Sequence, residues 1–421
     1  MIYRAKTKKF HADSPCLVLA PHLEYPLRNG ADILIDRKWS QFSNYVPFVD
    51  IVGKNCVSKY ENGKLVERKL YKNVEISKKV AALKTILNQS HYQFERFITN
   101  SARLIVEAHL MKPEYQTVVF SFIYTAAILK RKIESDEKLY LIETHNDELR
   151  WFSTFMKKTL KPWVLLPAIF SKRWLTHFLK EHEHDFLYVH ISIADRDGYL
   201  RLVPFHKSIV IPVGVEEESL DLSCLEEGGL SEKVRLLFVG SLSVETNFEA
   251  LKFFGDKFFP ILKENFKNDL EILIAGSMPT TAVERLCRTM SWKLMSNVSD
   301  QELRHLYNIS MFSILPFQYT TGGKLKLLKS LSNGVPYLGT PVLCNQIEKI
   351  LYPCYISGDP KEWLNHIKII QKRGIKESEK MELIDYAKEC SWSSVAYNMY
   401  QALCYNSFKS NKKRTTRNSG I

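Results

Sequence analysis

Residues 320–336, Thr-Thr-Gly-Gly-Lys-Leu-Lys-Leu-Leu-Lys-Ser-Leu-Ser-Asn-Gly-Val-Pro, constrain the fold of this 421-residue chain more than any other segment. They follow Phe312–Pro316, a short apolar run that predicts a buried strand. Leucines after the glycine turn recur at helical spacing, and Asn333-Gly334 and Pro336 are typical of a helix end. The pattern predicts a strand, a glycine turn and a helix, which together form a unit of an α/β sheet.

The glycine turn also predicts a binding site. Gly322 and Gly323 precede the helix, so its first backbone N–H groups and the positive end of its dipole are available to an anion. The Lys324 cation works against that dipole, so an anion is needed to make the arrangement favourable. We expect a phosphate there. The alternative is an ordinary surface helix that begins after a flexible turn.

The first half of the chain alternates short apolar runs with helical segments such as 92–110 and 122–131. This alternation predicts a parallel sheet with helices on both faces. The expected strands are Cys16–Ala20, Phe48–Val52, Thr117–Phe120, Leu139–Glu143, Phe186–Ile191 and Ser208–Ile211.

The pattern restarts at Lys233, with a helix expected over 247–264 and broken by Pro260. The expected strands are Arg235–Gly240, Leu270–Gly276, Phe312–Pro316, Val335–Gly339 and Tyr355–Ile356. Two α/β units joined near Val213–Val215 imply two lobes with a cleft between them. Ligands of such sheets bind at the carboxyl ends of the strands.

The formal charge of +13 leaves nucleic acid, nucleotides and an anionic membrane surface as partners to consider. Five of these charges lie in 406–421, a segment without acidic residues that we expect to be disordered. No reading module for nucleic acid is recognised, so we expect no specific nucleic-acid binding.

Neither a membrane span nor a secretion signal is predicted, because no apolar run approaches ~18 residues and no apolar core follows Met1–Phe10. The eight cysteines are scattered, with no Cys-x-x-Cys or Cys/His ligand spacing. We therefore expect reduced thiols, no zinc site and a cytoplasmic protein.

From about Cys16 to Leu403, the chain resembles the GT-B glycosyltransferases, specifically the retaining family 4. Residues 235–247 and 273–279 are similar to the first two strands of the nucleotide-binding lobe. Gly323-Lys324-Leu325-Lys326 matches the glycine-lysine turn of one subgroup, and Asn333–Pro336 matches the stop after it. Ser391-Trp392 resembles the opening of the last helix, which in this family crosses back to the first lobe.

Matches in the first half are shorter. His145-Asn146 follows a strand, and Ser192 with Asp195 fits the family's serine-x-x-aspartate. Pro212–Val215 fits the hinge. The resemblance implies two Rossmann-like, doubly wound parallel-sheet lobes. The expected boundaries are an acceptor-side lobe over 1–213, a nucleotide-sugar lobe over 214–383, a helix over 384–405 and the basic tail 406–421.

The chain departs from the family at two glutamates that usually flank the glycine turn eight positions apart. Thr321 and Lys329 occupy those places. A lysine cannot accept the hydrogen bonds of ribose hydroxyls. Recognition of ribose must differ, or the chain is a catalytically silent member of the fold that binds a glycan or a partner protein.

The resemblance implies a nucleoside diphosphate sugar as donor and a hydroxyl of a glycan or lipid-linked acceptor. It implies no metal and no other cofactor, since helix-terminus amides and Lys324 would stabilise the departing diphosphate. Lys326 is expected on another face, as a solvated charge. The donor-side candidates are Gly240, Ser241, Asn247, Gly276, Thr321, Gly322, Gly323 and Lys324.

On the acceptor side, His145 is the catalytic candidate, and Asn146 and Glu148 follow in the same loop. The loop from Pro21 to Asp32 ends near Gly30 and is placed to close over the acceptor. Plainer interpretations are a buried structural histidine, a polar loop and an ordinary connection.

Residues 150–180 contain seven basic and no acidic residues, interleaved with seven Trp and Phe. Such a segment suits the headgroup layer of an anionic bilayer, which predicts a peripheral position on the inner face of the membrane. Two helices whose aromatic residues fill the first lobe's core are the alternative.

The sequence thus predicts a glycosyltransferase for cell-surface polysaccharide or glycoconjugate synthesis. A nucleotide-sugar epimerase or dehydrogenase is disfavoured, because no Gly-x-Gly-x-x-Gly follows the first strand.

Overall fold

The structure is a computed structural model, and it describes residues 8–27, 30–73, 76–129, 137–158, 161–216, 233–318, 325–346 and 349–415. These residues form two compact units. The first lobe takes the described residues up to Val213 and again from Trp392, and the second lobe takes those from Gly214 to Ser391. No helix among the described residues is long and apolar enough to cross a membrane.

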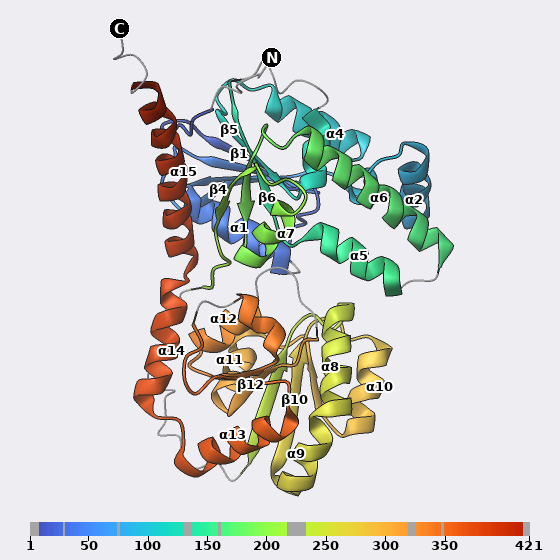
Figure 1. The fold of residues 1–421 in the computed structure, drawn as a ribbon, viewed down its shortest axis with the longest axis vertical. Helices are drawn as coiled ribbons and strands as arrows, with labels where there is room; N and C mark the ends of the chain where they lie inside the picture. Colours follow the sequence, from blue (N-terminus) through green and yellow to red (C-terminus); the bar gives the residue numbers. More distant parts are fainter. Residues whose placement is uncertain are drawn as a thin grey trace. The chain divides into compact units, whose positions relative to one another are not determined.

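The first lobe is built on an eight-stranded sheet with the order β4-β3-β2-β1-β5-β6-β7-β8 (Figure 1). Six strands are parallel and largely apolar, as expected for a sheet that helices cover. They are β1 (Cys16–Leu19), β2 (Val49–Val52), β5 (Thr117–Ser121), β6 (Leu139–Thr144), β7 (Leu187–His190) and β8 (Lys207–Val210). All six lie where the sequence predicted strands.

Two antiparallel strands at the edge, β3 (Cys56–Glu61) and β4 (Lys64–Leu70), were missed. Their turn is Asn62-Gly63, where both residues have positive φ, as a tight hairpin turn requires. The Asn-Gly pair was the signal that could have predicted this hairpin.

The helices of the first lobe are α1 (Gly30–Phe42), α2 (Lys78–Leu87), α3 (Tyr92–Phe97), α4 (Asn100–Leu110), α5 (Glu148–Lys158), α6 (Pro162–Glu181) and α7 (Ile193–Leu200). The single helix predicted over 92–110 is wrong, because Thr99 interrupts it and caps α4 by accepting a hydrogen bond from the N–H of Ala102. The segment predicted as a helix from residue 122 is a 3₁₀ helix, η1 (Ile123–Leu129).

The chain ends in α14 (Glu377–Glu389) and α15 (Trp392–Thr415), separated at Cys390-Ser391, where one helix over 384–405 was predicted. Helix α15 belongs to the first lobe, where Tyr400 stacks on Tyr45 with ring centroids 5.1 Å apart. The prediction of disorder from residue 406 is wrong for 406–415, because no Gly or Pro stops the helix before Thr415. Residues 416–421 lie outside the described ranges.

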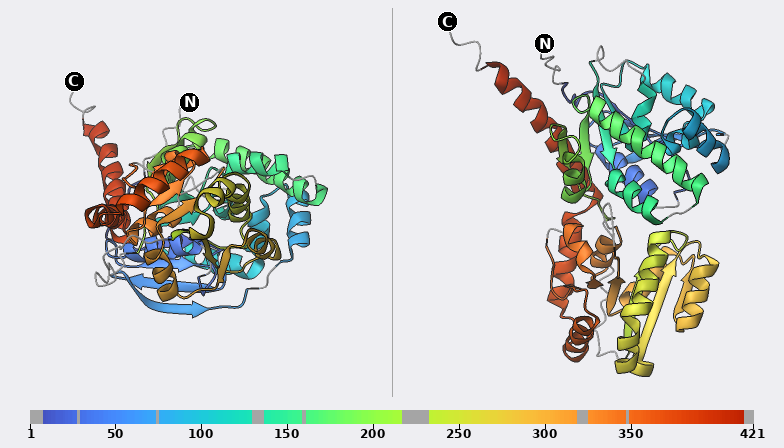
Figure 2. Two further views of the ribbon diagram at one scale, coloured as in Figure 1. Left: turned by 90° about the horizontal axis from the view of Figure 1, so that it is seen from below. Right: turned by 45° about the vertical axis from the view of Figure 1, so that its right-hand side comes forward.

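The second lobe has an all-parallel sheet of six strands in the order β11-β10-β9-β12-β13-β14. Helices flank both faces of this sheet (Figure 2). The strands are β9 (Val234–Val239), β10 (Leu270–Gly276), β11 (Lys293–Ser296), β12 (Phe312–Leu315), β13 (Tyr337–Gly339) and β14 (Tyr355–Ile356). The helices before α14 are α8 (Glu245–Lys257), α9 (Phe259–Phe266), α10 (Thr281–Met290), α11 (Asp300–Asn308), α12 (Leu325–Ser332) and α13 (Pro360–Arg373). Only β11 was not predicted.

Candidate functional site

A cavity of about 1320 Å³ lies within the first lobe. Its walls come from α2, α3, α5 and α6, and one end is formed by residues that follow β1, β5 and β6. Those strands are parallel, so their carboxyl ends meet at one edge of the sheet. This is the edge at which ligands of doubly wound sheets bind.

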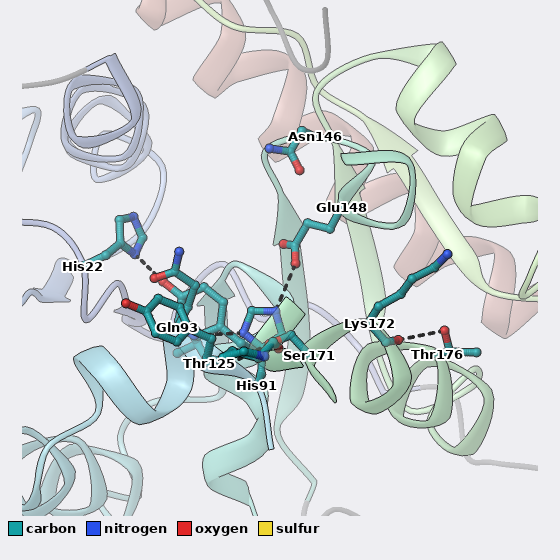
Figure 3. A network of polar contacts seen from close by, with 12 residues as sticks. His22, His91, Gln93, Thr125, Asn146, Glu148, Ser171, Lys172 and Thr176 are labelled. Atoms are coloured by element: carbon teal, nitrogen blue, oxygen red, sulfur yellow. Dashed lines mark hydrogen bonds and ion pairs between the residues drawn. The ribbon is translucent and has the colours of Figure 1, made fainter. Parts of the chain in front are cut away.

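Polar side chains gather at that end of the cavity (Figure 3). Within the described part of the chain, five of their buried atoms have no hydrogen-bond partner. They are His22 Nε2, His91 Nε2, Gln93 Oε1, Asn146 Oδ1 and Glu148 Oε1. A buried polar atom without a partner costs about 1–3 kcal/mol, so this end of the cavity is built to receive a polar ligand.

Glu148 and His91 point toward each other across the cavity (Figure 3), with Glu148 Oε2 and His91 Nε2 3.9 Å apart. Burial raises the pKa of Glu148 to about 8 and lowers the pKa of His91 to about 3. Both groups are therefore neutral near pH 7. His91 Nδ1 accepts a hydrogen bond from the Gln93 N–H at 3.2 Å, so the ring proton is on Nε2 and faces the cavity.

The Ser192 and Asp195 pair holds the loop that carries Glu148. Ser192 caps α7, and a carboxylate oxygen of Asp195 accepts the backbone N–H of Asp147 at 2.8 Å. The Tyr199 hydroxyl lies 3.4 Å from the backbone nitrogen of Glu148. The serine-x-x-aspartate motif thus fixes the start of α5 and the direction of the Glu148 side chain.

His145 is buried beside this cavity rather than among its lining residues. Its ring stacks on Phe122 at 4.1 Å between centroids, and its Nε2 lies 2.8 Å from Ser121 Oγ. Burial first, and then the nearby charge of Lys38, hold the pKa of His145 well below its usual range. His145 is therefore a neutral hydrogen-bonding group near pH 7, not a cation.

A buried ion pair lies behind His145. Lys38 and Glu143 are both almost fully buried and pair with each other, and Trp39 Nε1 donates to Glu143 Oε2 at 3.2 Å. The same oxygen is 3.8 Å from His145 Nε2. Burial lowers the pKa of Lys38, and the adjacent Glu143 carboxylate favours its charged form. The pair stabilises the end of β6, from which the His145 loop begins.

We expect Glu148→Gln to remove a pH dependence from the stability of the first lobe. The folded state holds the Glu148 proton up to about pH 8, whereas the unfolded chain releases it near the ordinary pKa of 4.5. This contribution to stability is full below pH 4.5 and is lost as the pH rises through 8. The free energy of unfolding should therefore fall by about 2–5 kcal/mol more in the native chain than in the variant over this interval.

Urea unfolding of both proteins between about pH 5 and 9 measures that difference, and groups common to both proteins cancel. Parallel pH profiles for the two proteins would show that Glu148 is already ionised at neutral pH.

In the second lobe, the predicted donor residues Gly240, Ser241 and Asn247 lie together just after β9. The Asn247 side-chain amide donates to the Ser241 carbonyl at 2.7 Å. The ammonium of Lys326 donates to the Asn247 side-chain oxygen. A Cβ atom at Gly240 would collide with that ammonium, so a larger residue there would displace the Lys326 side chain from this position.

The prediction that Lys326 is a solvated surface charge is wrong. The Lys326 ammonium lies 4.5 Å from the ring centre of Phe238, on β9, and 5.2 Å from that of Phe317, which follows β12. Lys326 is in the first turn of α12, so its side chain reaches back over the carboxyl ends of the central strands. The aromatic faces attract the cation and fix its position.

The close packing of two strand ends explains why position 276 holds a glycine, and no bound ligand is needed for that explanation. A Cβ there would lie 1.8 Å from the carbonyl oxygen of Gly240, so the strand ends of β9 and β10 approach closely only because the side chain is absent. The next turn is closed by Asn297, whose N–H donates to the Gly276 carbonyl at 2.9 Å.

Thr321, Gly322, Gly323 and Lys324, the centre of the predicted phosphate site, lie outside the described residues. Lys329, in the place of the family's second glutamate, is partly buried on α12. Burial lowers its pKa, and the carboxylate of Glu216 acts in the opposite direction. Gly30 is the exposed first residue of α1, and the preceding loop contributes His22 to the cavity instead.

His22, His91 and Gln93 were not predicted as site residues. His22 follows β1 by three residues, a position that could have marked it. His91 and Gln93 sit at the start of α3, which the sequence placed inside a longer helix. Among the described residues, no group of three or more His, Cys, Asp or Glu could hold a metal ion.

The aromatic and basic segment 150–180 forms α5 and α6. Phe152 and Phe178 are buried in the core of the first lobe, as the alternative interpretation required. Trp163 is 69% exposed, and Leu166 and Ile169 are also exposed on α6. The segment therefore contributes both to the core and to the surface.

Comparison with known proteins finds one family model that matches most of the second lobe. Residues 233–371 match the family model described as "Glycosyl transferases group 1". Over 340 residues, the chain is 22% identical to an "Uncharacterized 44.6 kDa protein in cps region" of Klebsiella pneumoniae, covering 77% of this chain and 82% of that protein.

Solved structures match over nearly the whole chain. A sucrose-phosphate synthase from Thermosynechococcus elongatus superposes with a TM-score of 0.65 at 12% identity, covering 94% of this chain and all of that one. A structure described as "Trehalose-6-phosphate from E. coli bound with UDP-2-fluoro glucose" gives 0.59 at 10% identity, covering 93% and 99%. Both likenesses show a shared fold, two Rossmann-like lobes of the GT-B type.

Proposed function

We propose that this chain of GT-B fold is a glycosyltransferase that moves a sugar from a nucleoside diphosphate sugar to a hydroxyl of a glycan or lipid-linked acceptor. In this reaction the bond from the anomeric carbon to the diphosphate oxygen breaks. The acceptor oxygen bonds to that carbon and gives up its proton, and the nucleoside diphosphate departs. Retention of configuration is the outcome that the resemblance to family 4 implies.

One observation carries the donor half of this proposal. The Lys326 ammonium lies beside Gly240 and Asn247 at the carboxyl ends of the central strands, within the segment that matches the glycosyltransferase family. A fixed cation there would stabilise the negative charge that builds on the departing diphosphate. The E. coli neighbour is described as bound to UDP-2-fluoro glucose, a nucleotide-sugar analogue, which supports a donor of this class.

We assign the acceptor to the first lobe. The cavity there ends in polar atoms without partners, and neutral His145 is held beside it. A neutral imidazole can hydrogen-bond to a hydroxyl of the acceptor or of the transferred sugar. Catalysis would rest on orientation and diphosphate stabilisation, without a divalent metal.

Incubation of the purified chain with a panel of UDP-, GDP- and ADP-sugars tests the proposal. We expect one donor to release its nucleoside diphosphate, slowly to water and faster with an acceptor, at a rate that EDTA leaves unchanged. If no donor is consumed and no nucleotide binds, the chain is the silent glycan- or partner-binding protein that Thr321 and Lys329 favour.

The Klebsiella pneumoniae relative is named as a protein in a cps region. We propose on that basis, and on the lipid-linked acceptors that the resemblance implies, a role in cell-surface polysaccharide synthesis on the inner face of the membrane. Arg173 and Lys180 are exposed on α6, the helix that also exposes Trp163. Basic residues on a helix that also exposes an indole suit an anionic membrane surface.

Sedimentation with anionic vesicles tests this contact. We expect the native chain to pellet with vesicles rich in anionic lipid, less so as salt rises, and not with neutral vesicles. The Arg173→Glu/Lys180→Glu variant should bind at least tenfold more weakly, since each basic residue near the surface contributes ~1 kcal/mol. The matched control is Lys252→Glu/Lys361→Glu, which reverses two exposed charges of the second lobe. Equal loss in both variants would contradict a specific role for α6.

A further inference from the structure

The first-lobe cavity extends well beyond its polar end. Most of the rest of its wall is apolar and comes from α2, α5 and α6, although Lys78 and Lys79 at the start of α2 also line it. The apolar wall residues are Ala82, Leu83, Ile86, Trp151, Phe155, Val164, Pro167 and Ala168. A sugar ring with its hydroxyls cannot hydrogen-bond to such a wall.

We infer that the acceptor is an amphiphile whose hydroxyl-bearing head meets the polar end of this cavity and whose aliphatic chain lies between α2, α5 and α6. This inference rests on the proposed function and deepens it, because it names the chemical class of the acceptor.

The polar end fits a hydroxylated head group. His91 Nε2 is a donor, Gln93 Oε1 is an acceptor, and the neutral Glu148 carboxyl can do both. A hydroxyl also donates and accepts, so a few of them can satisfy all of these atoms together. An uncharged head group leaves the buried Glu148 carboxyl neutral, whereas a cationic one would favour its ionised form.

The size and chemistry of the cavity fit the aliphatic chain of an amphiphile. About 1320 Å³ exceeds the ~300–1,000 Å³ that is usual for a small-molecule site. Most of the wall consists of aliphatic or aromatic carbon, which water solvates poorly. Leu83 is 57% exposed and Trp163 69% exposed, so the apolar surface continues outward from the cavity. A flexible aliphatic chain can follow such a surface, whereas a single aromatic ring would fill only a part of it.

Binding of alkyl glycosides of increasing chain length, below the concentrations at which they form micelles, tests the inference without requiring turnover. Calorimetry on the full chain should show affinity rising by about fourfold per methylene, the gain expected for burying each CH₂, up to the length that the cavity holds. The free sugar should bind at least a hundredfold more weakly than the long-chain glycosides. Affinities independent of chain length would overturn the inference, as would aryl glycosides that bind as tightly as the longest alkyl ones.

Two variants fill the cavity from two of the helices that line it. Ala82→Trp on α2 and Ala168→Phe on α6 should each shorten the chain length at which affinity stops rising. The control is Leu104→Trp, an exposed position on α4 away from the cavity. Circular dichroism shows whether each variant folds. If neither folds, the affinities of the native protein for alkyl glycosides of increasing length still test the inference. If both variants fold and affinity still stops rising at the native alkyl-chain length, the aliphatic chain of the ligand binds outside this cavity.

The same samples separate this inference from the proposed function. If the protein binds a nucleoside diphosphate and glycosylates short-chain glycosides as well as long-chain ones, the proposed function is supported and the amphiphilic acceptor is refuted. If the protein binds alkyl glycosides but no nucleotide, the cavity is a binding site for amphiphiles and the proposed enzymatic function is refuted.

Discussion

Lys326→Met is expected to lower the turnover of a nucleotide-sugar donor by about 10²–10³-fold, the usual cost of removing one group that stabilises developing negative charge. Methionine keeps the packing against Phe238 and Phe317 while removing the charge. The loss should fall mainly on kcat, because the diphosphate becomes most negative as it departs. Steady-state release of nucleoside diphosphate measures both constants.

Two further variants make this result interpretable. Lys326→Arg keeps the charge and should recover part of the lost turnover, although a guanidinium does not match the narrow space beside Gly240. Lys252→Met removes an exposed lysine from the surface of the same lobe and should leave turnover unchanged. Equal turnover in the native chain and in Lys326→Met would exclude Lys326 from diphosphate stabilisation.

Lys38→Met is expected to destabilise the first lobe by about 3–5 kcal/mol, because it leaves the Glu143 carboxylate buried and without its cation. Glu143→Leu should cost a similar amount, because it leaves the Lys38 ammonium buried and without its anion. Replacing both residues by apolar ones of similar size, in Lys38→Met/Glu143→Leu, should recover much of this loss, since no charge then remains buried.

Denaturant unfolding of the three variants measures these free energies, and a double-mutant cycle isolates the interaction between the two side chains. Additive losses in the double variant would show that the pair is not coupled. Because Glu143 also lies 3.8 Å from His145, the double variant should fold well and still lose activity if the pair positions the His145 ring.

Much of the fold could be predicted from the sequence, because buried parallel strands are short apolar runs with a strong local signal. Every parallel strand of the first lobe was predicted, and the edge hairpin at Asn62-Gly63 was missed because its strands are more polar. The helix boundaries were less accurate. Thr99 ends one helix by capping the next, and α15 continues because nothing in its sequence stops it.

The site could be predicted only in part, since its residues are brought together by contacts distant in sequence. His145, Asn146 and Glu148 were found because they follow a strand directly. His91 reaches Glu148 across 57 positions of the chain, and no local pattern marks that approach. Lys326 was assigned to the wrong face because helical spacing does not show that a lysine side chain bends back toward Gly240 and Asn247.

We propose that the carboxyl edge of the second-lobe sheet binds the diphosphate of a nucleotide sugar. Calorimetric titration of the full chain with UDP, GDP and ADP tests this binding directly. We predict that at least one of them binds in the micromolar to millimolar range and that Lys326→Met weakens this binding about tenfold or more, whereas Lys252→Met does not. Absence of binding for all three nucleotides, or identical affinities in the native chain and in Lys326→Met, would contradict it.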